Sequence, residues 1–474
     1  MTLQEQNKLL YARAGFGISI ADYRRPRPIK ECVVGLFPPT TPGRLEMISE
    51  EEWAENSPKA MKELTDDLMR KEKQKAFRER AKDLNQLWVQ AMVEAQYPLL
   101  EKMSIFWHGH FATHTANPYF DQLLLNDVRK NALGNFGDLL RAVSKSPAML
   151  QFLNNQQNKK AHPNENFARE VMELFTLGRG HYTEQDIKEA ARAFTGWAYD
   201  GYGMFVFHKG QHDDGEKQFL GRRGNWNGDD ILNILLEQKQ TALFISQKLY
   251  RYFVSDEKVN DKHVQQMAKH FYESNYDIAA LLKHMFTADW FYDDSVKGAK
   301  VKAPVELLVG YQRLLPIEFR NQNTVTYIQR VLGQHLFNPP NVAGWPGGKN
   351  WIDSSSLVIR MQLPQALFMS KELNLDLKPT EQEIMMTHKV NQSTSPNKNV
   401  RIGQAIADWS SYVAEWKGYG RAELPKAMAE YLLPVAVSNS QLNALQQFCD
   451  KDNEEDYIKS VSILLMGMPE YQLC

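Results

Sequence analysis

Apolar residues recur every three or four positions through most of this 474-residue chain. That spacing places them on one face of an α-helix, so it predicts a mainly α fold, built as one large helical domain with little β structure. The pattern predicts helices over residues 3–14, 58–96, 98–112, 118–132, 136–144, 164–177, 183–197, 228–237, 240–253, 261–274, 277–287, 305–315 and 357–369, with three or four more after residue 400.

Capping signals mark where two of these helices begin. Thr183 is followed three residues later by Asp186, a variant of the capping box in which each side chain accepts a bond from the other residue's backbone N–H. Ser57 precedes Pro58, and proline fits the first turn of a helix because its missing N–H would have no partner there. The highly charged stretch 58–96 contains no glycine, which favours one long amphipathic helix.

Proline, glycine and polar residues interrupt the helical pattern in four places. Residues 26–43, with PRPIKE and FPPTTPG, predict loop or extended chain. MFVF and EKQFLG flank HKGQHDDG between residues 201 and 221, which predicts a small β-hairpin. Residues 333–356 predict long ordered loops. The polar stretch 373–400 predicts a linker or mobile loop between a core domain, 1–372, and C-terminal helices, 401–474, that pack on the core.

Composition narrows the classes of partner. Lys and Arg number 56 against 57 Asp and Glu, a net charge of −1, so we expect no basic field that would attract nucleic acid. No stretch is apolar for about 18 residues, which argues against a transmembrane helix. The N-terminus MTLQEQNKLL lacks the basic and apolar segments of a secretory leader, so the sequence by itself predicts a cytoplasmic protein. The three cysteines form no disulfide or zinc-binding pattern.

Two histidines in FWHGHFATH are candidate metal ligands. The neutral imidazole of His108 or His110 has a nitrogen that can bind a divalent metal. On a continuous helix the two rings would lie about 200° apart, so both can face one ion only if Gly109 introduces a non-helical kink. The alternative is that one histidine packs in the core, bonded to a carbonyl, while the other faces solvent.

The segment NENFAREVMELF carries a second set of candidates. Glu170 and Glu173 lie three residues apart on one helical face, where their carboxylates can converge on a metal ion or a buried arginine. Glu170 is the candidate ligand or general base, and Arg169 is the candidate group for orienting a carboxylate or an anionic substrate. The alternative is a solvated face on which Arg169 and Glu173, four residues apart, form an ordinary surface pair.

Two loops add further candidates. His212 and Asp213 lie beside the expected hairpin turn, where a histidine next to carboxylates fits acid–base or metal chemistry. The alternative is the ordinary turn chemistry of Asp-Asp-Gly. Trp345 and Trp351 lie in PPNVAGWPGGKNW, and exposed rings on a rigid loop suit a sugar or an apolar ligand, whereas buried rings would only anchor the loop.

Eight segments with distinctive sequences follow one another along the chain: RAGFG (13–17), FWHGHFAT (106–113), LGNFGDLLRAVSKSPAML (133–150), NENFAREVMELFTLGRGHYTEQDI (164–187), ARAFTGW (191–197), HDDGEKQFLG (212–221), KAPVE (302–306) and PPNVAGWPGGKNW (339–351). Together they resemble a bacterial family known as domain of unknown function 1800 (DUF1800). The resemblance implies no established activity, but it covers Glu170 and Glu173 and favours a site there. Many members of that family look exported, often with a twin-arginine signal, which this sequence does not show.

Two hypotheses remain after the common signatures are excluded, because the chain has no P-loop, no GxSxG and no HExxH. The first is an enzyme in which His108, His110 and Glu170 hold a divalent metal that activates water for hydrolysis. The second is a non-catalytic binding or assembly protein with a structural Arg–Glu–His network, whose partner is a small molecule, a glycan or a protein. Convergence of imidazoles and carboxylates on one pocket would favour the enzyme, and groups satisfied within the fold would favour the binding protein.

Overall fold

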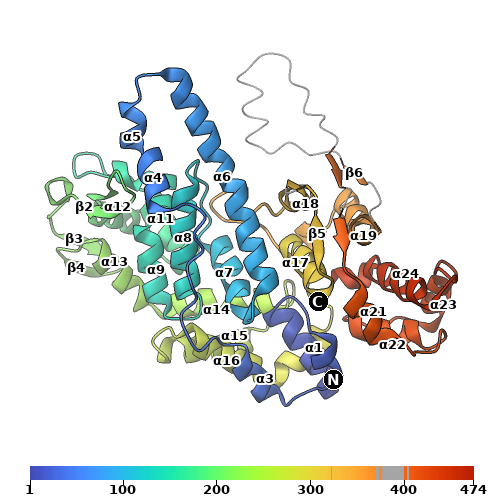
Figure 1. Cartoon of the computed structure of the whole chain (residues 1–474). Coiled ribbons are helices and arrows are strands. Elements are labelled where there is room, and N and C mark those ends of the chain that lie inside the picture. The colour runs from blue at the N-terminus through green and yellow to red at the C-terminus, as the bar shows by residue number, and fades with distance from the viewer. Residues whose placement is uncertain (322, 370–372, 376–399, 403–404) are drawn as a thin grey trace.

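Helices form most of the described chain, as the apolar periodicity predicts (Figure 1). The computed structural model describes residues 1–321, 323–369, 373–375, 400–402 and 405–474, so most of the predicted linker lies outside the described residues. The first helices are α1 (Leu3–Ala14), α2 (Ile20–Arg24), α3 (Ile29–Gly35), α4 (Glu50–Asn56), α5 (Pro58–Glu63), α6 (Asp67–Glu94), α7 (Pro98–His110), α8 (Pro118–Asn131), α9 (Phe136–Lys145), α10 (Pro147–Phe152), α11 (Asn166–Glu170), the π-helix η2 (Val171–Thr176) and α12 (Glu184–Ala193).

The later helices extend from the middle of the chain to its C-terminal part. They are α13 (Gly228–Leu236), α14 (Lys239–Phe253), α15 (Asp261–Glu273), α16 (Ile278–Phe286), α17 (Pro304–Leu314), α18 (Asn323–Leu332), α19 (Ser354–Phe368), α21 (Ser410–Trp416), α22 (Leu424–Leu432), α23 (Asn439–Gln446) and α24 (Glu454–Met466). Short 3₁₀ turns lie at η1 (Asn155–Gln157), η3 (Lys209–Gln211), η4 (Asp289–Tyr292), η5 (Asp294–Val296), η6 (Gly348–Trp351) and η7 (Pro469–Gln472). No helix within the described ranges is long and apolar enough to cross a membrane.

Helix starts follow the capping chemistry, with two corrections. The capping box of Thr183 and Asp186 at α12 is confirmed. The single helix expected over 58–96 is wrong: α5 ends at Glu63, and Asp66 starts α6 afresh by accepting bonds from the N–H groups of residues 68 and 69. The loop expected over 26–43 is also wrong in part, because its prolines flank residues 29–35 rather than fill them, and α3 begins directly after Pro28.

The small β content differs in pairing from the expected hairpin. β2 (Phe205–Phe207) and β3 (Lys217–Phe219) both exist, but each pairs with another strand, β1 (Trp197–Tyr199) and β4 (Arg222–Gly224) respectively. Leu220 and Gly221 join β3 to β4 with φ of 46° and 80°, the two positive values that a tight two-residue hairpin turn requires. Elsewhere in the described segments, β5 (Ile317–Phe319) pairs with β8 (Ala405–Ala407), and β6 (Leu373–Leu375) pairs with β7 (Val400–Ile402).

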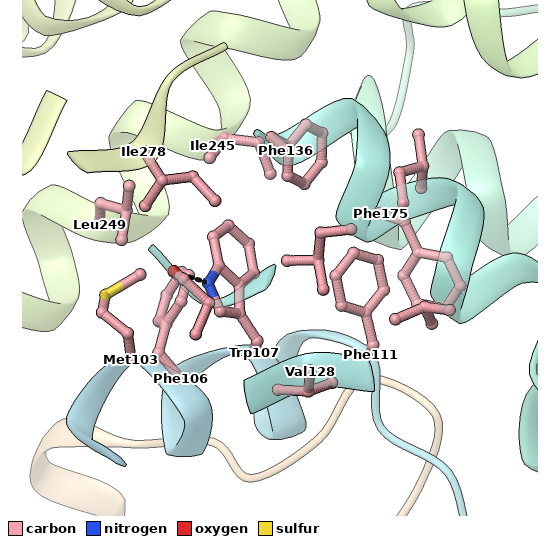
Figure 2. Close-up of a cluster of buried hydrophobic side chains, with 14 of the residues drawn as sticks. Met103, Phe106, Trp107, Phe111, Val128, Phe136, Phe175, Ile245, Leu249 and Ile278 are labelled. Carbon is pink, nitrogen blue, oxygen red and sulfur yellow. Dashed lines mark hydrogen bonds between the residues drawn. The ribbon is translucent and has the colours of Figure 1, made fainter. Parts of the chain in front are cut away.

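Helix α7 lies at the centre of the larger hydrophobic core. All of its residues except Pro98 and Gly109 are buried, as expected for a helix that is apolar around most of its circumference. Trp107 is fully buried and donates its indole N–H to the carbonyl of Ala132 at 3.0 Å. Figure 2 shows this ring among Met103 and Phe106 of the same helix and aromatic and aliphatic side chains from α9 and α14.

A second core joins the helices from α17 onward to the middle of the chain. Side chains of α17, α18 and α19 pack with those of α21, α22 and α24, and α6 and α7 contribute Trp88 and Ile105. In Figure 1 the long helix α6 therefore stands between α8–α14 on one side and the C-terminal helices on the other. The proposed division into a core, a linker and C-terminal helices stays a prediction.

Candidate functional site

His108 and His110 lie on opposite sides of α7. The helix continues through Gly109 to His110, so it lacks the non-helical kink that binding of one ion by both rings would require. His108 faces Trp88, with ring centroids 5.2 Å apart, and its Nε2 accepts the backbone N–H of Phe337 at 3.0 Å. Burial lowers the pKa of His108 to about 3, so this imidazole is neutral.

His110 instead points toward the end of the π-helix η2. Its Nε2 lies 3.1 Å from the carbonyl oxygen of Phe175, and its Nδ1 lies 3.0 Å from the Nζ of Lys248, which also donates to the carbonyl of Leu174. The carbonyls at the end of a helix have no partner within it, and here two side chains supply partners. Burial, and then the nearby Lys248, hold the pKa of His110 well below its usual value.

The charged residues of NENFAREVMELF do not form the surface pair that the sequence allows. Arg169 binds the carboxylate of Glu184 with contacts of 2.8 and 2.9 Å. Glu173 binds the Nε of Arg179 at 2.5 Å and the hydroxyl of Tyr182 at 2.8 Å. The Arg169–Glu173 surface pair, given as the alternative to a site, is therefore wrong. Glu170 is half-buried, and burial followed by the charge of Glu173 raises its pKa.

His212 and Asp213 hold a loop in place. The Nδ1 of His212, which is buried, lies 2.9 Å from the carbonyl oxygen of Thr195. Asp213 accepts two bonds from the guanidinium of Arg192, at 2.7 and 3.2 Å. This bidentate pair lowers the pKa of Asp213 and is typical of a structural ion pair that anchors a turn.

The tryptophan loop packs against the end of α7. Trp351 is buried, and Trp345 is half-buried with its ring 5.5 Å from that of His108. Gly344 has a φ of 80°, and a Cβ there would lie 2.2 Å from the carbonyl oxygen of Gly109. Only glycine permits so close an approach of two backbones, so this loop is pinned to the helix.

The three proposed metal ligands are not brought to one point. His108 and His110 diverge, and both are bonded to the backbone of other segments. Within the described ranges, no group of three or more His, Cys, Asp or Glu side chains has the arrangement of a metal site. The metal-dependent hydrolase stays a prediction, without a converging donor set to support it.

An open cavity lies elsewhere, between α1, α17 and the C-terminal helices, which lie close together in Figure 1. Its volume is about 420 Å³, within the range of small-molecule pockets. We call it the α1–α17–α22 cavity. Its lining includes Glu5, Lys8, Leu9, Ala12, Phe16, Lys102, Lys297, Lys302, Glu306, Leu307, Gly310, Arg313, Leu314, Glu415, Tyr431, Leu432, Tyr471 and Cys474.

A buried ion pair forms the floor of the cavity. The Nζ of Lys102, on α7, lies 2.6 Å from an Oε of Glu306, and both side chains are buried. The other carboxylate oxygen of Glu306 accepts the backbone N–H of Ala303 at 3.0 Å, at the start of α17. Burial tends to raise the pKa of Glu306, but the charge of Lys102 and its hydrogen bond hold it below the usual value.

Three further cations on the lining bind backbone carbonyls instead of carboxylates. Lys302 donates to the carbonyl of Tyr471 at 2.7 Å, Lys8 donates to the carbonyl of Leu433 at 2.7 Å, and Arg313 donates to that of Val93 at 2.8 Å. Burial lowers the pKa of Lys302 and of Lys8 to about 8. None of the three makes an ion pair with a carboxylate of the described residues, although the negative charges of the Cys474 terminus and of Glu306 oppose the lowering of the Lys302 pKa.

Two of the eight distinctive segments build this cavity. The RAGFG turn follows α1, and the carbonyl oxygen of Phe16 would lie 3.2 Å from a Cβ at Gly310, so the glycine lets the turn approach α17. KAPVE contributes Lys302 and Glu306. Sequence reasoning missed the site because these segments are almost 290 residues apart. One signal was available: Glu101 and Lys102 are adjacent charges in an otherwise apolar helix, and both form buried ion pairs.

Comparison with known proteins gives one match. A family described as protein of unknown function (DUF1800) matches residues 9–473, which is nearly the whole chain. No curated protein and no solved structure matches this chain. The match covers both RAGFG and KAPVE, as well as the histidine and carboxylate segments. The chain therefore belongs to the DUF1800 family.

Proposed function

We propose that the protein binds a small organic molecule in the α1–α17–α22 cavity, and that the histidine and carboxylate segments serve the fold. One observation carries this proposal: open volume and buried charged side chains coincide at this cavity, where Lys102, Lys302 and Glu306 lie on the lining. A concave, partly apolar pocket with a few convergent polar groups is the usual form of a ligand site.

The residues named as catalytic candidates support the same view by their contacts. His110 is bonded through both ring nitrogens, and Asp213 is held by a bidentate arginine. Arg169 and Glu173 each have partners within the fold. None of these residues lines the cavity. A network that satisfies its own donors and acceptors ties helices together and has little left to offer a substrate.

A dye-binding experiment tests the proposal. Nile red is neutral and fluoresces in apolar surroundings, so we expect its emission to rise with the wild-type protein. The variant Ala12→Phe would fill the cavity from α1 and is expected to lose this signal. Ala54→Phe adds the same ring on an exposed face of α4, away from the cavity, and is the matched control that should bind as wild type. Equal binding by Ala12→Phe would overturn the proposal.

Elemental analysis tests the competing hydrolase. We expect less than one equivalent of Zn, Fe or Mn per chain in protein purified without chelator, with no change on His110→Ala. A full equivalent of metal that disappears in His110→Ala, but remains in a control such as His208→Ala, would favour the metal site and count against the structural role of His110. Circular dichroism of each variant would check that the helices are retained.

A further inference from the structure

We propose that the ligand of this cavity is an amphiphilic organic acid, with its carboxylate at Lys302 and its apolar body along the cavity wall. The inference rests on the proposed function, since it names the chemical class of the molecule that the cavity would hold. It follows from which charges on the lining already have partners and which do not.

Each carboxylate on the lining is already paired. Glu306 binds Lys102 at 2.6 Å, and Glu5 binds Lys297 at 2.7 Å. Glu415 binds Arg24 at 2.7 Å. The terminal carboxylate of Cys474, which also lines the cavity, accepts a hydrogen bond from the guanidinium of Arg13 at 2.7 Å. No carboxylate of the lining is therefore left to bind a cationic ligand, and a positively charged molecule would have to displace an existing partner.

Cationic groups on the lining, in contrast, exceed the carboxylates that neutralise them. Lys302, Lys8 and Arg313 donate to main-chain carbonyls and make no ion pair within the described residues. Lys302 directly precedes the N-cap of α17 and lies four residues before Glu306, whose buried carboxylate pairs with Lys102 of α7. An ammonium group has three N–H donors, and the ammonium of Lys302 makes one hydrogen bond in the described structure.

The ring of Tyr471 fixes this ammonium in place. The Nζ of Lys302 lies 3.6 Å from the centroid of that ring, as well as 2.7 Å from the carbonyl of the same residue. A cation over an aromatic face is attracted by the ring, so the ring and the carbonyl together hold this ammonium at the cavity lining. A single carboxylate would match this single ammonium in charge and would form a charge-assisted hydrogen bond with it.

The walls suit an apolar body. Leu9, Phe16, Leu307, Leu314, Tyr431 and Leu432 contribute side chains from α1, the RAGFG turn, α17 and α22. Apolar side chains on several walls of a half-enclosed space favour a ligand that buries hydrocarbon surface, because that removes it from water. A small inorganic anion would leave these walls without a partner.

Competition against Nile red tests the assignment. Octanoate and 1-octanol have the same chain length but differ in charge, so their ratio isolates the contribution of the carboxylate. We expect octanoate to displace the dye at roughly tenfold lower concentration than 1-octanol, in line with one hydrogen bond between charged groups. Lys302→Met should remove this preference while leaving displacement by 1-octanol unchanged, and Lys302→Arg should restore part of it.

Lys248→Met is the matched control. The ammonium of Lys248 also donates to a main-chain carbonyl, and burial lowers its pKa to about 8, but it does not line the cavity. The preference for octanoate should persist in this variant. Equal displacement by the two ligands in the wild type, no displacement by either, or a preference that survives Lys302→Met would each overturn the organic acid. Failure of the dye itself to distinguish Ala12→Phe from wild type would instead remove the cavity as a site.

Discussion

Helix α7 serves two regions that differ in how fully their polar groups are satisfied. His108 and His110, in its last turn, are buried in the core, where each is bonded to the backbone of a segment far away in the sequence. Two turns earlier, Lys102 reaches the lining of an open cavity, where Lys302, Lys8 and Arg313 bind main-chain carbonyls and make no ion pair within the described residues. The contacts of His108 and His110 are thus structural, although their segment is the more distinctive in sequence. Lys102, in contrast, lies beside open volume that can hold a ligand.

The comparison teaches that residue type alone is a weak guide to a site. Histidine in an unusual sequence draws attention because it so often binds metals. Burial keeps His108 neutral, and its imidazole serves as the acceptor of a hydrogen bond from the backbone of Phe337. The α1–α17–α22 cavity is marked instead by a surplus of positive charge beside open volume. That property arises only when several segments of the chain come together to form its walls.

The largest effect is expected in the core. Trp107→Ala removes a fully buried ring and its bond to Ala132, so we expect the free energy of unfolding to fall by about 3–5 kcal/mol. Urea unfolding followed by circular dichroism would measure it. Trp345→Ala is the control, because this half-buried ring at the end of the same helix should cost less. A loss below that of Trp345→Ala would contradict the central place of α7 in the core.

The polar link between α7 and η2 should come next. His110→Phe keeps a ring in place but leaves the Nζ of Lys248 and the carbonyl of Phe175 without this partner, which we expect to cost about 1–3 kcal/mol. A double-mutant cycle with Lys248→Met would sharpen the result, because residues in direct contact should show non-additive losses. Strict additivity would mean that the contact between the two side chains contributes nothing to stability.

The next effect is expected in the affinity of the cavity for its ligand, which should depend on pH. The groups that face Lys302 are the C-terminal carboxylate, Glu306, Lys102 and Arg360, and burial lowers the pKa of Lys302 to about 8 from 10.5. Without ligand, the folded protein loses this proton first, so the Lys302 contribution to stability increases as pH rises from about 8 toward 10.5. A bound carboxylate favours the ammonium, so octanoate affinity should fall about fivefold between pH 8 and pH 9.

Titration calorimetry at several pH values would measure that fall. Lys302→Met should make the affinity weaker and nearly independent of pH over this interval, since the titrating group is gone. A pH dependence that is unchanged in Lys302→Met would assign it to another group, such as Lys8, whose pKa burial also lowers to about 8.

The smallest effect is expected at a residue first considered catalytic. Asp213→Asn preserves the shape of the side chain but removes its charge from the pair with Arg192, whose side chain is partly exposed. We expect a loss of under about 1 kcal/mol in unfolding free energy, and no change in dye binding. A change in dye binding would show that this loop communicates with the cavity, against the separation of the two regions.

Local patterns in the sequence predicted much of the helical framework. The range of α1 and the capping box of α12 follow directly from spacing and capping residues. The apolar spacing does not mark the break before α6, where Asp66 caps a new helix with its side chain. The β3–β4 hairpin was missed because Leu220 adopts a positive φ, which leucine rarely does and which local propensity does not foresee.

The candidate site was beyond the reach of such patterns for a physical reason. The sequence does not distinguish a buried lysine that binds a main-chain carbonyl from an exposed lysine on the surface. Only the folded structure shows which of the two is buried. Lys302 binds the carbonyl of Tyr471 and shares the cavity lining with residues of α1, and both of these segments are distant from it along the chain. Sequence reasoning did find the segments that matter, RAGFG and KAPVE, but only as marks of family membership and without their shared location.

The bond from Lys8 to the end of α22 has a consequence for how the protein is made. The two sides of the cavity are 422 residues apart along the chain where Lys8 meets Glu430. A ribosome that adds 5–20 residues per second needs roughly 20–80 s to supply the second side after the first has emerged. During that interval the apolar face of α1 has no final partner there, so a nascent chain offers chaperones a target that the finished protein conceals.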